Sequence, residues 1–250
     1  MSCTLKEKRF LDILDHKTPD KMPFYFPTVT CSVASELLGR KAISGGDSIH
    51  FYEEKSWLMG ENAHDEFVAQ YYEDTIAVHK ILRADILRMT WRNDNKPTKM
   101  LDENTLLFGD ENGKHIIRRY FPEENAYGTL VNTVIPQTPE ELIASFKEKM
   151  DKGTDISAEQ IKADYAESLT LKELTKNDFA YMFQGCGLHY SMVDPVWLMA
   201  SALYPDVFEE YFLFQAHRAV HVIDFLATQG ARFLNGGIDI ATGNGTKSIT

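Results

Sequence analysis

The stretch Ala84-Asp-Ile-Leu-Arg-Met-Thr-Trp91 decides how this chain is interpreted, because it reads as a buried strand entered directly from a helix. The preceding segment, Asn62 to Leu82, carries its apolar residues at helical spacing. Further upstream, Met22-Pro-Phe-Tyr-Phe26 has the character of another short buried strand, with its proline near the strand start. A strand, a helix and a second strand in succession predict a parallel sheet.

Two more strands are predicted towards the C-terminus. Asp178 to Gly187 reads as a strand followed by its carboxyl-end loop, and the segment from Ala231 reads as a strand that runs into a glycine-rich loop reaching Thr250. In α/β proteins, ligands bind in the loops beyond the carboxyl ends of strands. Capping and proline signals predict helices over residues 5–14, 34–38, 140–150, 158–174 and 205–228, and one more that opens at Asp194-Pro195.

The segment from Leu101 to Ile135 interrupts the alternation. It contains three β-like runs separated by the turn sequences Asp110-Glu-Asn-Gly113 and Pro122-Glu-Glu-Asn125. We therefore expect an inserted β-meander at about 101–135 within one domain that covers 1–250.

Composition restricts the class of protein. Of the 250 residues, 44% are hydrophobic and 25% are charged, as in ordinary globular proteins, and the formal net charge is −11. The acidic balance argues against nucleic-acid binding, and no apolar run is long enough to span a membrane. Cys3, Cys31 and Cys186 are far apart and odd in number, which argues against a disulfide framework and fits a reducing cytoplasm.

Two histidine groups have the residue types of metal ligands. His217 and His221 are four residues apart on a predicted helix with Asp224 nearby, but Arg218 stands where a metalloprotease motif needs glutamate. The pattern therefore favours a surface or packing role. His64, beside acidic residues on its helix, is interpreted in the same way, as part of a solvated face.

The strand-end loops carry the candidate substrate contacts. Gln184, His189 and Tyr190 surround Cys186 in one loop, for which ligand contact and inert packing both remain open, with a nucleophilic thiol the weakest interpretation. In the terminal loop, Asp239 either orders the loop through neighbouring amides or faces a substrate.

Three phrases in the chain resemble the uroporphyrinogen decarboxylase superfamily. Phe10-Leu-Asp-Ile-Leu-Asp-His-Lys-Thr-Pro-Asp-Lys-Met-Pro-Phe24 is similar to the family's opening segment, and Gly236 to Gly245 is similar to its glycine-containing segment after a middle strand. Gly185 to Tyr190, followed by Leu198 to Phe208, is similar to a further loop and its helices. The resemblance implies an α/β fold of the (β/α)8 TIM-barrel family, of which this chain would supply about the first half.

The superfamily includes decarboxylases of uroporphyrinogen and methyltransferases that move a methyl group between a corrinoid protein and a thiol such as coenzyme M. The decarboxylases carry an arginine-rich motif after the first strand. At that place this chain reads Pro27-Thr-Val-Thr-Cys-Ser-Val-Ala34, and the next arginine after this segment is Arg40. A multiply anionic substrate needs bidentate cationic partners. The resemblance therefore favours a methyltransferase over porphyrin biosynthesis, with activity expected of a completed chain.

The resemblance also implies the surroundings of the site. The methyltransferase zinc is held by a His-x-Cys pair and a later Cys, so zinc is expected only if such a downstream half exists, and no cofactor is identified in these residues. The expected partner is a small molecule or a corrinoid protein. A non-catalytic paralogue that binds a partner or completes its barrel as a homodimer remains the alternative from another class. The predicted barrel mouth comprises Asp239 as the catalytic residue and Arg88, Gln184, His189, Tyr190, Asn235 and Asn244 as substrate-binding residues.

Overall fold

The structure is a computed structural model that describes residues 3–90, 92, 94–185, 188–191 and 194–236. It is a mixed α/β protein with two sheets, and the described strands do not close into a barrel. The chain divides into two compact units, one comprising residues 1–134 and 171–182 and the other residues 135–170 and 183–250. Each unit is described separately below.

The helices that open the first unit form where capping residues predict them. Helix α1 (Leu5–Leu14) begins with a capping box, because Glu7 N donates to Thr4 Oγ1 while Glu7 Oε2 accepts from Thr4 N at 2.8 Å. Helix α2 (Cys31–Leu38) ends at Gly39, whose φ of +66° is the left-handed conformation that glycine adopts without strain. Both helices were predicted, although α2 begins three residues earlier than expected.

The parallel sheet follows the predicted succession but with shorter strands. Strand β1 (Ile86–Leu87) forms a parallel bridge with Tyr25 on one side, and β6 (Ala180–Gln184) pairs with it in parallel on the other. The predicted strand over residues 22–26 is thus a single bridge, because the prolines at 23 and 27 have no N–H for a ladder. The boundary between the units falls within β6, and β7 (Phe233–Asn235) completes the order β1-β6-β7.

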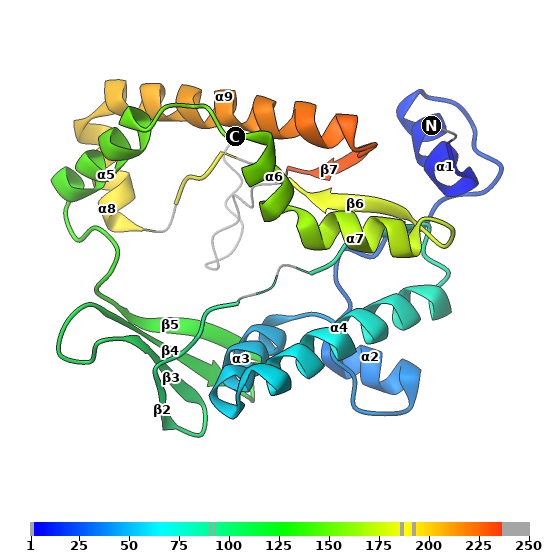
Figure 1. Ribbon diagram of the computed structural model, residues 1–250, viewed down its shortest axis with the longest axis horizontal. Coiled ribbons are helices and arrows are strands. Elements are labelled where there is room, and N and C mark those ends of the chain that lie inside the picture. The colour runs from blue at the N-terminus through cyan, green and yellow to red at the C-terminus, as the bar shows by residue number, and fades with distance from the viewer. Residues whose placement is uncertain (1–2, 91, 93, 186–187, 192–193, 237–250) are drawn as a thin grey trace. The chain divides into compact units, whose positions relative to one another are not determined.

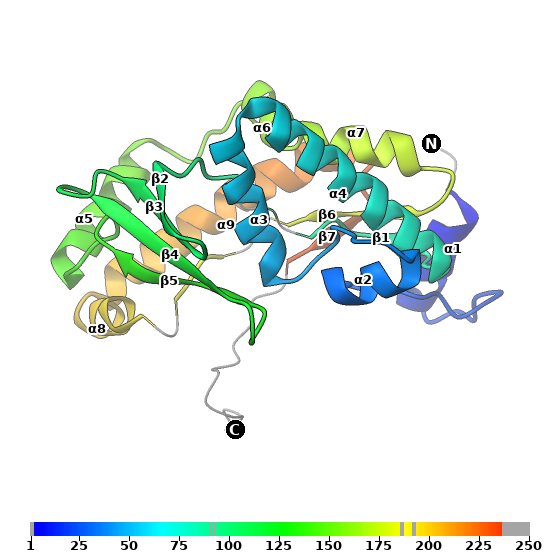
Figure 2. The ribbon, with the colours of Figure 1, turned by 90° about the horizontal axis from the view of Figure 1, so that it is seen from below.

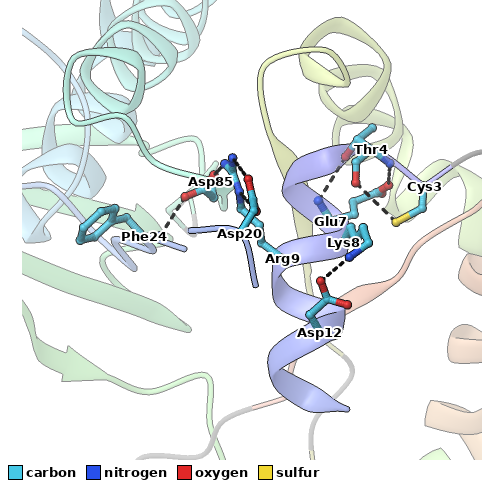
Figure 3. Close-up of polar contacts among 9 residues, drawn as sticks. All are labelled: Cys3, Thr4, Glu7, Lys8, Arg9, Asp12, Asp20, Phe24 and Asp85. Carbon is cyan, nitrogen blue, oxygen red and sulfur yellow. Dashed lines mark hydrogen bonds and ion pairs between the residues drawn. The ribbon is translucent and has the colours of Figure 1, made fainter. Parts of the chain in front are cut away.

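Asp85 holds the edge of this sheet in the first unit (Figure 3). Its side chain is 1% exposed and accepts hydrogen bonds from Phe24 N at 3.0 Å and from Arg9 Nη1 at 2.7 Å. Its backbone also accepts from Ala180 N at 2.9 Å. One buried carboxylate therefore joins α1 and the Tyr25 segment to the start of β1.

The first unit also contains a helix that the sequence analysis missed. Helix α3 (Asp47–Ser56) is followed by a 3-10 turn, η1 (Trp57–Met59), and by the predicted long helix α4 (Glu61–Ile81). The N-cap of α3 is Gly46, which has no side chain to accept a capping bond, so the sequence carries no cap signal for this helix.

The inserted meander is confirmed, but it has four strands where three β-like runs were predicted, because the strand over Lys99–Asp102 was missed. Four antiparallel strands lie in the order β2-β3-β4-β5, and Figures 1 and 2 show them as a separate twisted sheet beside α3. Its core is a cluster of Phe51, Leu106, Phe108 and Tyr120, with the Phe51 and Tyr120 rings stacked 5.0 Å apart. The strands are β2 (Lys99–Asp102), β3 (Thr105–Gly109), β4 (His115–Phe121) and β5 (Ala126–Asn132).

Five helices make up most of the chain between residues 139 and 228. Helix α5 (Pro139–Asp151) is capped by Thr138, whose hydroxyl accepts from Glu141 N, as its cap signal predicts. The single helix predicted over 158–174 is wrong in one respect, because it breaks at Tyr165, whose ring lies 6.4 Å from Phe183. The remaining helices are α6 (Ala158–Asp164), α7 (Ala166–Thr175), α8 (Pro195–Leu203) and α9 (Pro205–Thr228).

The core of the second unit is aromatic. Phe146 is 1% exposed and stacks on Tyr211 with ring centroids 3.8 Å apart, while Trp197 and Phe208 meet it edge to face. Figure 1 shows α5 and α8 gathered at the N-terminal end of α9, where these rings meet. The cluster packs α5, α8 and α9 together.

Candidate functional site

The carboxyl ends of β6 and β7 bring two of the predicted site residues together. Asn235 Nδ2 donates to Gln184 Oε1 at 3.3 Å, and Gly185 N donates to Asn235 O at 2.7 Å. A Cβ on Gly185 would lie 2.1 Å from that carbonyl oxygen, so the close approach of the two strands requires glycine there. Two carboxamides at adjacent strand ends offer both donors and acceptors to a polar ligand.

His189 and Tyr190 lie against helices. His189 exchanges backbone hydrogen bonds with the Gln215 side chain, and its ring meets Trp197 edge to face at 5.1 Å. Tyr190 packs on the aromatic core of the second unit, with its hydroxyl 3.4 Å from Ser201 Oγ. Both rings therefore have packing partners, as the packing interpretation of this loop expects.

Arg88 follows β1, and only part of its guanidinium group has a hydrogen-bond partner. Its Nη2 donates to Pro27 O at 2.9 Å, while its buried Nε has no hydrogen-bond partner. A buried donor without a partner carries a free-energy cost that a ligand or a water molecule would remove. Close by, the phenol of Tyr25 has a pKa raised by burial, and the charge of Arg88 opposes that rise.

The terminal-loop residues Asp239 and Asn244 and the thiol of Cys186 lie outside the described residues. Their predicted roles therefore stay predictions. Arg40, the first arginine after the Tyr25 segment, is engaged elsewhere in its unit, because Nη2 pairs with Asp74 Oδ1 at 2.5 Å.

A pocket of about 710 Å³ opens in the first unit, which is within the size range of small-molecule sites. It reaches the N-terminus of α2 at Cys31 and Ser32, just beyond the Tyr25 segment, and a tip of the meander at Asn125. The remaining wall comes from α3, α4 and the residues around Ile43. Its polar lining includes Ser35, Lys41, Ser48, Tyr52, Lys55 and Gln70.

The sequence analysis missed two adjacent buried carboxylates on α3. Glu53 and Glu54 are both 0% exposed. Arg92 Nε donates to Glu53 Oε1 at 2.8 Å, while Glu54 accepts from Arg118 and Tyr127. A signal was present, because Glu53 follows the buried Ile49 by four residues and so shares its helix face.

Burial changes the titration of this cluster. Desolvation raises the pKa of Glu54, although the hydrogen bond from Tyr127 and the charge of Arg118 oppose the rise. The pKa of Tyr127 is also raised, first by burial and then by its hydrogen bond to Glu54. Both Glu54 and Tyr127 therefore keep their protons to a higher pH than they would in water.

The prediction that His64 lies on a solvated face is wrong. It is 4% exposed, and its ring stacks on Trp57 with centroids 3.8 Å apart. Its Nδ1 lies 3.1 Å from Ser56 Oγ and its Nε2 lies 3.3 Å from Asp94 Oδ1. Helical periodicity could not reveal this burial, because the covering groups come from η1 and from the segment after β1.

His217, His221 and Asp224 are exposed on α9, in keeping with the surface role favoured for them. Among the described residues, the one group of three potential metal ligands is Glu53, His64 and Asp94, whose ligand atoms lie within 4.8 Å of one another.

Comparison with known proteins does not assign a family. Searches of protein-family models, of curated proteins and of solved structures each gave no match. None of the helices in the described part of the chain has both the length and the apolar character needed to cross a bilayer.

Proposed function

We propose that this chain is a methyltransferase-like member of the uroporphyrinogen decarboxylase superfamily, of the type that moves a methyl group between a corrinoid protein and a thiol. The observation that carries the proposal is the strand order. Tyr25, β1, β6 and β7 are neighbours in the sheet in the same order in which they occur along the chain.

This order favours the family's (β/α)8 barrel over a doubly wound sheet. In a barrel each new strand joins the same side of the previous one, whereas a doubly wound sheet reverses its order at a switch point. Helices separate each strand from the next, as the barrel requires. In this proposal the described strands form the first part of the barrel wall.

The arginines favour methyl transfer over decarboxylation. A multiply anionic porphyrinogen needs several guanidinium groups near the strand ends. Arg40 is paired with Asp74, and Arg9 is paired with Asp20 and Asp85 at the N-terminal side of β1. Arg88 directly follows β1, and Arg92, further along the same segment, is paired with Glu53.

The carboxamides of Gln184 and Asn235 would orient a neutral or singly charged acceptor. In the proposed transfer, the acceptor thiolate would form the new carbon–sulfur bond with the methyl group of the methylated corrinoid protein, and that donor would keep the electron pair of the bond that breaks. The thiol proton leaves to solvent. Hydrogen bonds from two amides suit positioning of the acceptor rather than proton transfer.

The test is methyl transfer by the full-length protein, using methylated corrinoid proteins as donors and several thiols as acceptors. Formation of a thioether is expected, and Gln184→Ala or Asn235→Ala should each lower kcat/KM by about tenfold, the value of one hydrogen bond. Gln160→Ala, which removes an exposed amide on α6, is the matched control.

Absence of thioether with every corrinoid donor would reject the proposal. Conversion of uroporphyrinogen to coproporphyrinogen would instead establish the decarboxylase alternative. A stable protein that has neither activity but binds a corrinoid protein, or forms a homodimer, would favour the non-catalytic paralogue.

A further inference from the structure

We infer that Glu53, His64 and Asp94 form a binding site for a divalent transition metal, with Zn²⁺ as the cation that its donors fit best. The three residues come from α3, α4 and the segment after β1, all in the first unit. The site shares no residue with the strand ends on which the proposed function rests, and it does not depend on that function.

The hydrogen bonds of the His64 ring set its tautomer. Ser56 Oγ donates its proton to Glu53 O at 2.6 Å, so it can only accept from the ring, and Nδ1 must carry a hydrogen. In neutral histidine, Nε2 then presents a lone pair. Metal-binding histidines are held in this way, with the second ring nitrogen donating to a neighbouring acceptor.

That lone pair faces another acceptor. Nε2 of the buried ring lies 3.3 Å from Asp94 Oδ1, which also accepts from Trp57 Nε1 at 2.9 Å. Two acceptors at this distance repel each other unless a proton or a cation lies between them. The distance exceeds the roughly 2.7–2.9 Å of a charge-assisted hydrogen bond.

The same distance suits two ligands of one metal. Atoms that are each about 2.0–2.1 Å from a tetrahedral zinc lie about 3.3 Å apart. Glu53 offers the third donor within 4.8 Å, so its side chain must approach by a small rotation. Arg92 bonds one of its oxygens, and a carboxylate has lone pairs enough to serve both partners.

The types of donor favour zinc, and the exposure of Asp94 allows the ion to enter from solvent. One imidazole and two carboxylates suit zinc, whereas Ca²⁺ and Mg²⁺ prefer oxygen alone. Glu53 and His64 are buried, but the Asp94 side chain is 55% exposed, so a cation can reach the site from solvent. Three protein ligands leave a fourth position for water.

Calorimetric titration of the chelator-treated 250-residue chain with Zn²⁺ tests the site. We expect one zinc per chain, and Asp94→Asn should weaken binding by at least about 100-fold, because loss of a ligand exceeds the tenfold to 100-fold cost of losing an outer partner. The carboxamide oxygen introduced by this substitution can still accept from Trp57 Nε1, so the fold should persist. Asp65→Asn, the same charge change on an exposed neighbour of His64, is the matched control.

Exposed histidines on α9 could bind zinc independently. The double variant His217→Gln/His221→Gln should therefore retain the zinc, and Co²⁺ bound to it should give the intense visible absorption of a four-coordinate site. The inference is overturned if the wild-type chain binds no zinc, if Asp94→Asn binds it as Asp65→Asn does, or if the double variant loses it.

Discussion

Replacement of Asp85 by alanine should destabilise the first unit by about 3 kcal/mol. The substitution removes a charge-assisted hydrogen bond from Arg9, worth about 1.5–3 kcal/mol, and a second bond of about 1 kcal/mol from Phe24 N. Because the carboxylate is 1% exposed, water does not readily replace these bonds. The loss corresponds to a decrease in Tm of about 6–12 °C for a domain of this size.

Urea denaturation followed by circular dichroism gives the change in stability, and hydrogen exchange of the peptide that contains Phe24 and Tyr25 locates it. Exchange of this peptide should accelerate in Asp85→Ala, because its anchor to β1 is lost. Asp20→Ala removes the other partner of Arg9, but that carboxylate is 52% exposed, so the midpoint should hardly move. Equal shifts in the two variants would refute the reasoning.

Two further predictions concern the cores. Phe146→Ala should lower the free energy of unfolding of the second unit by about 3–5 kcal/mol, because it leaves a cavity between Tyr211, Trp197 and Phe208. Phe24 is exposed, so Phe24→Ala should destabilise the protein far less. Thermal unfolding of the two variants measures the difference. Burial lowers the pKa of His79 below its ordinary 6.5, so the unfolded chain takes up the proton first and stability should be lost as pH falls from 6.5 towards the lowered pKa. The urea midpoint should therefore fall in this range for the wild type and fall less in His79→Gln, and parallel pH curves for the two proteins would contradict the assignment.

Local signals predicted most of the fold. Thr4, Thr138 and Asp194 cap their helices through contacts within three residues, so the sequence suffices to place them. The meander was predicted from turn sequences for the same reason. The strands were placed correctly in order, but their lengths depended on partners: Tyr25 makes one bridge and β1 covers two residues.

The sequence by itself therefore determined the starts of α1, α5 and α8, the parallel succession of strands and the inserted meander, because each follows from propensity and period within a few neighbouring residues. The tertiary structure decided which polar groups are buried. Glu53 meets Arg92 across 39 positions and Glu54 meets Arg118 across 64, and His64 is covered by Trp57 and approached by Asp94. A charged side chain on a helix can be solvated or buried with the same local sequence, and only a partner brought from a distant segment makes its burial stable.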